Sequence, residues 1–191
     1  MLQHLTVTGG RTTGDDGGGI HAGDYTTLLL DHATVSGNST AGMYADGGGI
    51  YAYSVTLTDS TVSGNSSGES DGGGIGGGDV TLANSTVSGN SAHSGGGIYG
   101  YSVTLTDSTV SGNAAVLYGG GISGNYMMLS NSIIAGNGDS GPAPDIFGSI
   151  TASNGHNILG SDVEESISGD LNKRVCCSPE MHSSTSLPKM L

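Results

Sequence analysis

The sequence predicts an all-β fold: a right-handed, single-stranded parallel β-helix (a solenoid) with about 23–25 residues and three short strands per coil. The composition is the first indication, since 37 of the 191 residues are glycine, tryptophan is absent and phenylalanine occurs once. A large aromatic core is therefore excluded. The second indication is a repeated unit, and the third is an alternation of apolar and polar residues within that unit.

Two motifs recur together along the chain. GGGI places its isoleucine at positions 20, 50, 75, 98 and 122, with spacings of 30, 25, 23 and 24 residues. TVSGN and its variants place an asparagine at positions 38, 65, 90, 113 and 137, with spacings of 27, 25, 23 and 24 residues. Because the two series keep step, one structural unit is repeated.

The segments VTL and STV alternate with period two, which indicates half-buried strands. Coils stacked about 4.8 Å apart would place equivalent residues in columns. The expected inward columns are those of the GGGI isoleucines and three others: Val35, Val62, Val87, Val110, Ile134; Leu30, Leu57, Leu82, Leu105, Leu129; and Leu28, Val55, Val80, Val103, Met127.

Two polar columns are expected to be structural ladders, because stacked amides can bond to each other and to the backbone. One is formed by the TVSGN asparagines. The other lies between the VTL strand and the STV strand and comprises His32, Asp59, Asn84, Asp107 and Asn131.

Two rival repeat folds fit less well. A leucine-rich repeat needs a helical segment in each unit, and strings such as SSGESDGGG do not supply one. A calcium-binding β-roll needs a nonapeptide period, and GGIGGGD occurs once.

The pattern divides the chain into three parts. Residues 1–160 are the β-helix repeats, residues 161–172 a terminal extension and residues 173–191 a tail expected to be disordered, in which Cys176 and Cys177 are adjacent. Met1 falls inside a coil, so we expect either end-to-end self-association of the isolated chain or a further N-terminal portion in a parent protein.

The charge excludes several partners. The formal net charge is −13, from 17 acidic and 4 basic residues, and a surface this acidic repels nucleic acid and anionic membranes. No apolar run has the length of a membrane span, so no membrane insertion by this chain is expected. The first residues lack the pattern of a signal peptide, so the signal segment of an exported protein would lie outside this chain.

The unit GGGIYAYSVTLTDSTVSGNSS resembles the repeats of bacterial surface β-helix proteins. These include polymorphic outer-membrane proteins and autotransporter passengers, and the wider relatives form the pectate-lyase-like superfamily. The resemblance implies an extracellular or cell-surface location and a scaffold or adhesin that binds glycans through repeated ladders. It also leaves open a polysaccharide lyase or glycoside hydrolase, and it implies a ligand along the outer face of the first strand.

On that face, alternation predicts two outward columns. One contains His21, Tyr51, Gly76, Tyr99 and Ser123, and the other contains Gly23, Tyr53, Gly78, Tyr101 and Asn125. Tyrosine rings stack on sugars, and a floor of glycine admits a sugar closely. The predicted glycan-binding residues are therefore Tyr51, Tyr53, Tyr99, Tyr101 and His21.

Asp16, Asp46 and Asp71 each precede a glycine triplet and are expected to stack on successive coils. Their repulsion would be relieved by calcium, which prefers oxygen ligands, so calcium is the candidate ion; carboxylates that point into solvent are the alternative.

The sequence argues against catalysis. A lyase of this superfamily would need a base, and Arg11 is the only basic residue before Asn172. A His21–Asp16 acid–base pair is the weaker alternative. A third function, ice binding, is indicated by hydroxyl columns: Thr27, Thr56, Thr81 and Thr104; and Thr34, Thr61, Thr86 and Thr109 beside Ser36, Ser63, Ser88 and Ser111.

Overall fold

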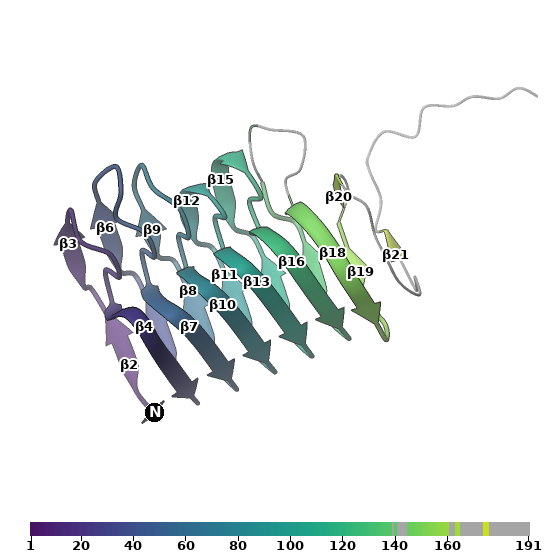
Figure 1. Cartoon of the computed structure of the whole chain (residues 1–191), viewed down its shortest axis with the longest axis horizontal. Coiled ribbons are helices and arrows are strands. Elements are labelled where there is room, and N and C mark those ends of the chain that lie inside the picture. The colour runs from purple at the N-terminus through teal and green to yellow at the C-terminus, as the bar shows by residue number, and fades with distance from the viewer. Residues whose placement is uncertain (139, 141–144, 161–162, 165–173, 176–191) are drawn as a thin grey trace, which may run out of the picture.

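The computed structural model describes residues 1–138, 140, 145–160, 163–164 and 174–175. These residues form a right-handed parallel β-helix of about 6 turns, as the sequence predicts, and none of them is in an α-helix. Successive coils stack along the long axis of the molecule, and the strands of neighbouring coils lie side by side (Figure 1).

The strands form three parallel sheets, two of eight strands and one of five, and each of the first five coils contributes one strand to each sheet. The first sheet contains β1 (Leu2–Gln3), β4 (Ile20–Asp31), β7 (Ile50–Thr58), β10 (Ile75–Ala83), β13 (Ile98–Thr106), β16 (Ile122–Ser130), β18 (Ile146–Asn154) and β20 (Val163–Glu164). The second sheet contains β2 (Thr6–Thr8), β5 (Thr34–Ser36), β8 (Thr61–Ser63), β11 (Thr86–Ser88), β14 (Thr109–Ser111), β17 (Ile133–Ala135), β19 (Ile158–Leu159) and β21 (Arg174–Val175). The third sheet contains β3 (Arg11–Thr13), β6 (Ser39–Ala41), β9 (Ser66–Ser67), β12 (Ser91–Ser94) and β15 (Ala114–Tyr118).

The repeat pattern suggests GGGI, VTL and STV as three separate strands, and the structure divides the coil differently. The isoleucine of GGGI and the VTL segment belong to one continuous strand of 9 residues in β7, β10 and β13. The third strand instead follows the SGN turn. The column that includes His32 therefore lies at the corner between the first and second sheets, where every member has a positive φ.

The four predicted apolar columns form the core. The valines and isoleucine of the TVS strands from Val35 to Ile134 are fully buried, and so are Ile50, Ile75, Ile98 and Ile122. Leu28 and Ile20, at the N-terminal end of the stack, are less enclosed than their counterparts. A core one or two side chains wide is filled by aliphatic residues, which explains the scarcity of aromatic residues.

The register contradicts two predicted columns in β4. Irregularities between His21 and Thr27 displace the strand, so that Gly23 pairs with Ala52 and Thr27 with Ser54. Leu29, rather than Thr27, is the partner of Thr56. The cause is the longer β4 strand of 12 residues, whose extra residues have no counterpart in β7.

The predicted asparagine ladder is present and buried. From Asn65 to Asn137, the Oδ1 atom of each asparagine accepts hydrogen bonds from both the backbone nitrogen and the side-chain amide of the asparagine one coil earlier. At the start of the ladder, Oδ1 of Asn38 accepts from the Gly10 backbone nitrogen. Asp145 takes the next place and accepts both bonds from Asn137. The ladder satisfies polar groups that would otherwise be buried at the turns.

A second buried ladder consists of serines, which the sequence analysis did not identify. Ser60, Ser85, Ser108 and Ser132 each accept a hydrogen bond from the backbone nitrogen one coil earlier. Each hydroxyl also donates to the carbonyl two residues before it. The signal was present in the repeated S-T-V that precedes SGN.

At the C-terminal end, β20 pairs with β18 and β21 pairs with β19, so both extend the sheets. The remaining residues of the predicted extension (161–172) and tail (173–191) lie outside the described residues, and these divisions stay predictions. Within the described part of the chain, no helix is long and apolar enough to cross a membrane.

Candidate functional site

A hollow of about 360 Å³ lies where the strands of the first sheet begin. It spans four coils, because its lining starts at Asp71 and Gly77 and ends at Phe147. The other lining residues are Ser94, Tyr99, Gly100, Tyr101, Tyr118, Ser123, Gly124 and Asn125. We call this hollow the aromatic trough.

Four partly exposed rings line the trough. Tyr99 and Tyr101 come from the start of β13, Tyr118 ends β15, and Phe147 lies on β18. The rings of Tyr118 and Phe147 are stacked, with centroids 4.6 Å apart and planes inclined by 25°. Stacked coils therefore gather residues from different sheets at one edge of the molecule.

Glycine forms part of the trough lining for a steric reason. An added Cβ at Gly124 would lie 2.8 Å from the Gly100 carbonyl oxygen and 3.3 Å from Cγ2 of Val103. At Gly100, the same atom would lie 3.1 and 3.3 Å from the valine side chains beneath it. A larger residue at either position would press on the core, so core packing requires glycine in this part of the trough lining.

Asp71 brings a carboxylate to the trough. Burial raises the pKa of Asp71, and the charge of Asp46 raises it further, whereas hydrogen bonds from the Ser94 hydroxyl and backbone nitrogen oppose that shift. Burial, followed by the charges of Asp71 and Asp46, also raises the pKa of Tyr99. At neutral pH the phenol of Tyr99 is therefore neutral and lies in the same trough as the Asp71 carboxyl group.

The structure stacks Asp16, Asp46 and Asp71 on successive coils, as the sequence predicts, and gives them backbone partners. The Asp46 backbone nitrogen donates to Oδ1 of Asp16 at 2.8 Å, and that of Asp71 donates to Oδ1 of Asp46 at 3.1 Å. Burial, followed by repulsion from Asp46, raises the pKa of Asp16, although the hydrogen bond from Asp46 opposes the shift. The column is a hydrogen-bonded ladder, and calcium binding to it stays a prediction.

The structure separates the five predicted glycan-binding residues. Tyr99 and Tyr101 line the aromatic trough, whereas Tyr51, Tyr53 and His21 lie outside it, on the preceding coils. The His21 ring contacts that of Tyr51 with the planes inclined by 52° and the centroids 5.6 Å apart, and His21 Nδ1 is 3.0 Å from the Asp16 carbonyl oxygen. The predicted acid–base pair would need His21 to contact the Asp16 carboxylate. In the structure His21 contacts the Asp16 backbone carbonyl instead.

The predicted glycine floor between the pair Tyr51 and Tyr53 and the pair Tyr99 and Tyr101 is covered. Gly76 is buried, and a Cβ there would lie 2.9 Å from the Gly47 nitrogen in the neighbouring turn. Tyr53 leans over Gly78, where a Cβ would be 3.6 Å from two of its ring carbons. The turn at Gly47 and the ring of Tyr53 fill the space that Gly76 and Gly78 leave. The open hollow lies on the other side of Tyr99.

Tyr118, Phe147 and Tyr126 were not among the site residues predicted from the sequence. Tyr126 contacts Tyr101 edge to face, with ring centroids 5.2 Å apart, so it supports a ring that lines the trough. Tyr118 was visible as the residue that takes the place of Asp16, Asp46 and Asp71 in its own coil. Phe147, the only phenylalanine, was visible as an outlier in composition.

The described lining residues offer little for catalysis. They include one carboxylate, that of Asp71, and neither a lysine, an arginine nor a histidine. Glycoside hydrolysis ordinarily needs two carboxylates, and proton abstraction by a lyase needs a base. The trough is better suited to holding a ligand than to transforming one.

Comparison with family models, with curated proteins and with solved structures finds no match to this chain. The β-helix fold is therefore shown by the structure, while the resemblance to bacterial surface β-helix proteins and to the pectate-lyase-like superfamily stays a prediction.

Proposed function

We propose that the protein is an extracellular or cell-surface β-helix scaffold that binds a glycan in the aromatic trough without cleaving it. The observation that carries the proposal is the grouping of Tyr99, Tyr101, Tyr118 and Phe147 around one hollow. The sequence predicted glycan binding through ladders repeated along the first sheet. The proposal confines binding to the trough, where β10, β13, β16 and β18 begin.

The chemistry of the trough favours a neutral or cationic sugar. Flat rings bind the apolar faces of pyranose units, and Ser94, Asn125 and Asp71 supply polar partners for hydroxyl groups. A polyanionic sugar would be repelled by the net charge of −13 unless a cation bridged the two.

A glycan-array screen of the whole chain, in calcium and again in EDTA, tests the proposal. For each glycan retained, calorimetry then compares the parent protein with Tyr101→Ala and Phe147→Ala. Losing one stacking ring is expected to weaken binding about fivefold, which corresponds to about 1 kcal/mol. Loss of binding in EDTA would point to the column of Asp16, Asp46 and Asp71.

Tyr44→Ala is the matched control, since Tyr44 is 85% exposed and lies outside the trough. Equal weakening by this variant, or no glycan bound in either buffer, would overturn the proposal. The retained glycans are also assayed for reducing and unsaturated ends. Release of either product would replace binding by the lyase or hydrolase function.

A second candidate function, ice binding, is favoured by the second sheet. Its outward threonines stay in register over five coils without irregularity: Thr6, Thr34, Thr61, Thr86 and Thr109. A regular array of hydroxyl and methyl groups on a flat sheet is suited to an ordered water surface. Thermal hysteresis in the parent protein and its loss in Thr86→Tyr, but not in Asp79→Tyr at an exposed residue of the first sheet outside the threonine columns, would support this function. Equal behaviour of the two variants would oppose it.

A further inference from the structure

The corner between the first and second sheets is built from residues in the left-handed backbone conformation. Six successive coils place a non-glycine residue there with φ between 47° and 50°: His4, His32, Asp59, Asn84, Asp107 and Asn131. Asparagine, aspartate and histidine tolerate this conformation better than most residues. Backbone geometry therefore explains the residue types, and it stacks their side chains at a fixed spacing.

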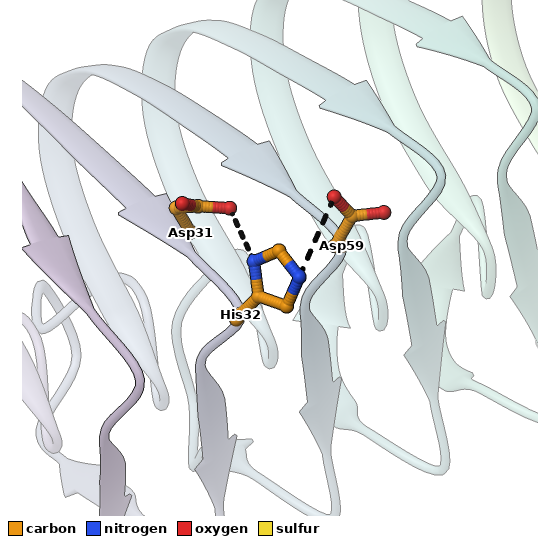
Figure 2. A group of neighbouring side chains, drawn as sticks. All are labelled: Asp31, His32 and Asp59. Atoms are coloured by element: carbon orange, nitrogen blue, oxygen red, sulfur yellow. Dashed lines mark hydrogen bonds and ion pairs between the residues drawn. The ribbon is translucent and has the colours of Figure 1, made fainter.

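In two neighbouring coils this corner brings one imidazole between two carboxylates (Figure 2). Nδ1 of His32 lies 2.6 Å from Oδ1 of Asp31, and Nε2 lies 3.9 Å from Oδ2 of Asp59. One ligand atom from each of the three residues can be chosen so that all lie within 4.8 Å of one another. The corner is accessible, since 53% of the His32 side chain is exposed.

Neighbouring residues hold both carboxylates in place. Nε2 of Gln3 donates to Oδ2 of Asp31 at 2.8 Å, and Nδ2 of Asn84 donates to Oδ1 of Asp59. Each carboxylate thus has one oxygen engaged by an amide and the other directed at His32. Orientation of this kind reduces the entropy that a ligand would have to remove.

The two sides of the imidazole differ in a way that matters chemically. Asp31 is at hydrogen-bond distance and favours the tautomer with its proton on Nδ1, which leaves the lone pair of Nε2 directed toward Asp59. The 3.9 Å separation on that side is too long for a hydrogen bond. An ion about 2.0–2.1 Å from each atom would have a ligand angle of about 150° between them, and an approach of the two side chains by about 0.5 Å gives the tetrahedral angle that zinc prefers.

We propose that Nε2 of His32 and Oδ2 of Asp59 bind a divalent transition-metal ion, with Asp31 orienting the imidazole. An imidazole nitrogen with carboxylate oxygens selects zinc, nickel or copper over calcium. A carboxylate bonded to the other nitrogen of a metal-binding histidine is a common support for such sites. The ring of His4, with its centroid 4.9 Å from that of His32, places a second imidazole one coil away.

This site is separate from the aromatic trough, because it lies where strands β4 and β7 end, whereas the trough lies where β13 and β16 begin. Its exposed side leaves coordination positions to water or to a ligand from solution. The inference therefore does not depend on glycan binding.

Calorimetric titration of Zn²⁺ at pH 7.5 tests the proposal on the full chain, with Cys176 and Cys177 replaced by serine because thiolates also bind zinc. His32→Asn and Asp59→Asn are each expected to lose one equivalent of Zn²⁺ relative to that background. Asparagine suits the left-handed corner, as Asn84 and Asn131 already occupy it. Equal melting temperatures without metal would verify that the variants fold.

Asp107→Asn is the matched control, since it removes the same charge from the same corner two coils away. Nitrogen-detected NMR of the imidazoles gives a second readout, in which Zn²⁺ shifts the Nε2 resonance of His32. The proposal is overturned if the parent background binds no Zn²⁺, if His32→Asn or Asp59→Asn keeps the full stoichiometry, or if Asp107→Asn loses as much.

Discussion

Asn65 donates two hydrogen bonds to one oxygen atom of Asn90: its backbone nitrogen and its Nδ2 lie 2.9 and 3.0 Å from Oδ1. Nδ2 of Asn65 also donates to the Val35 carbonyl oxygen at 3.0 Å. Both asparagines are 1% exposed. The Asn65 side chain thus connects three consecutive coils, in a buried place where water cannot replace its hydrogen bonds.

Replacing Asn90 by alanine is expected to destabilise the fold by about 4 kcal/mol. The substitution leaves two buried donors of Asn65 without an acceptor and removes the donor to the Val62 carbonyl oxygen. Each buried polar group left unsatisfied costs about 1–3 kcal/mol. Urea unfolding followed by circular dichroism measures the change.

Ser88→Ala is a suitable control for Asn90→Ala, because Ser88 lies in the same coil on the outward, half-buried side of β11. We expect a change within about 0.5 kcal/mol for this variant. Similar losses in the two variants would show that the ladder contributes little to stability.

Asn84 permits a test of the left-handed corner. Alanine and glycine both remove the hydrogen bond from Asn84 to Asp59, but only glycine adopts the observed φ of 49° without strain. Asn84→Ala is therefore expected to be less stable than Asn84→Gly by about 1 kcal/mol. Measuring both unfolding curves isolates the backbone contribution, and equal stabilities would mean that the corner relaxes.

The core and the asparagine ladder could be predicted from the sequence because they depend only on equal spacing. Where coils have 23–25 residues, a residue such as Val87 finds its counterparts Val62 and Val110 at the expected distance along the chain. In β4 the spacing is longer, and the prediction for Thr27 was wrong there. The extra residues of β4 could form a bulge at any of several positions, and the repeat pattern does not indicate which position.

The aromatic trough could be predicted only in part. Tyr99 and Tyr101 follow the repeat. Tyr118 reaches the trough through an irregular pairing, because the register of β12 with β15 shifts between Ala92 and Ser94. Phe147 pairs in regular register with Ser123, but its coil lacks the GGGI motif that marks the earlier units. The covering of Gly76 and Gly78 depends on side-chain packing, which residue spacing does not encode.

Asp71 predicts a pH dependence of stability. Burial raises its pKa above the ordinary value of 3.8, so the folded state binds the proton more tightly than the unfolded state does. The ionised carboxylate therefore destabilises the fold above the raised pKa, and protonation relieves that destabilisation as the pH falls toward 3.8. Asp71→Asn keeps an oxygen acceptor for Ser94 and cannot ionise, so it should melt about 2 °C above the parent protein at pH 7.

The difference in melting temperature between Asp71→Asn and the parent is expected to shrink as the pH is lowered toward 4. Thermal melts at pH 7, 6, 5 and 4 measure it, in EDTA so that no cation compensates the charge. Asp79→Asn, in which the same charge is removed from an exposed residue of β10, is the control and should shift the melting temperature less at pH 7. A difference for Asp71→Asn that stays constant across the series, or that grows toward low pH, would contradict the raised pKa.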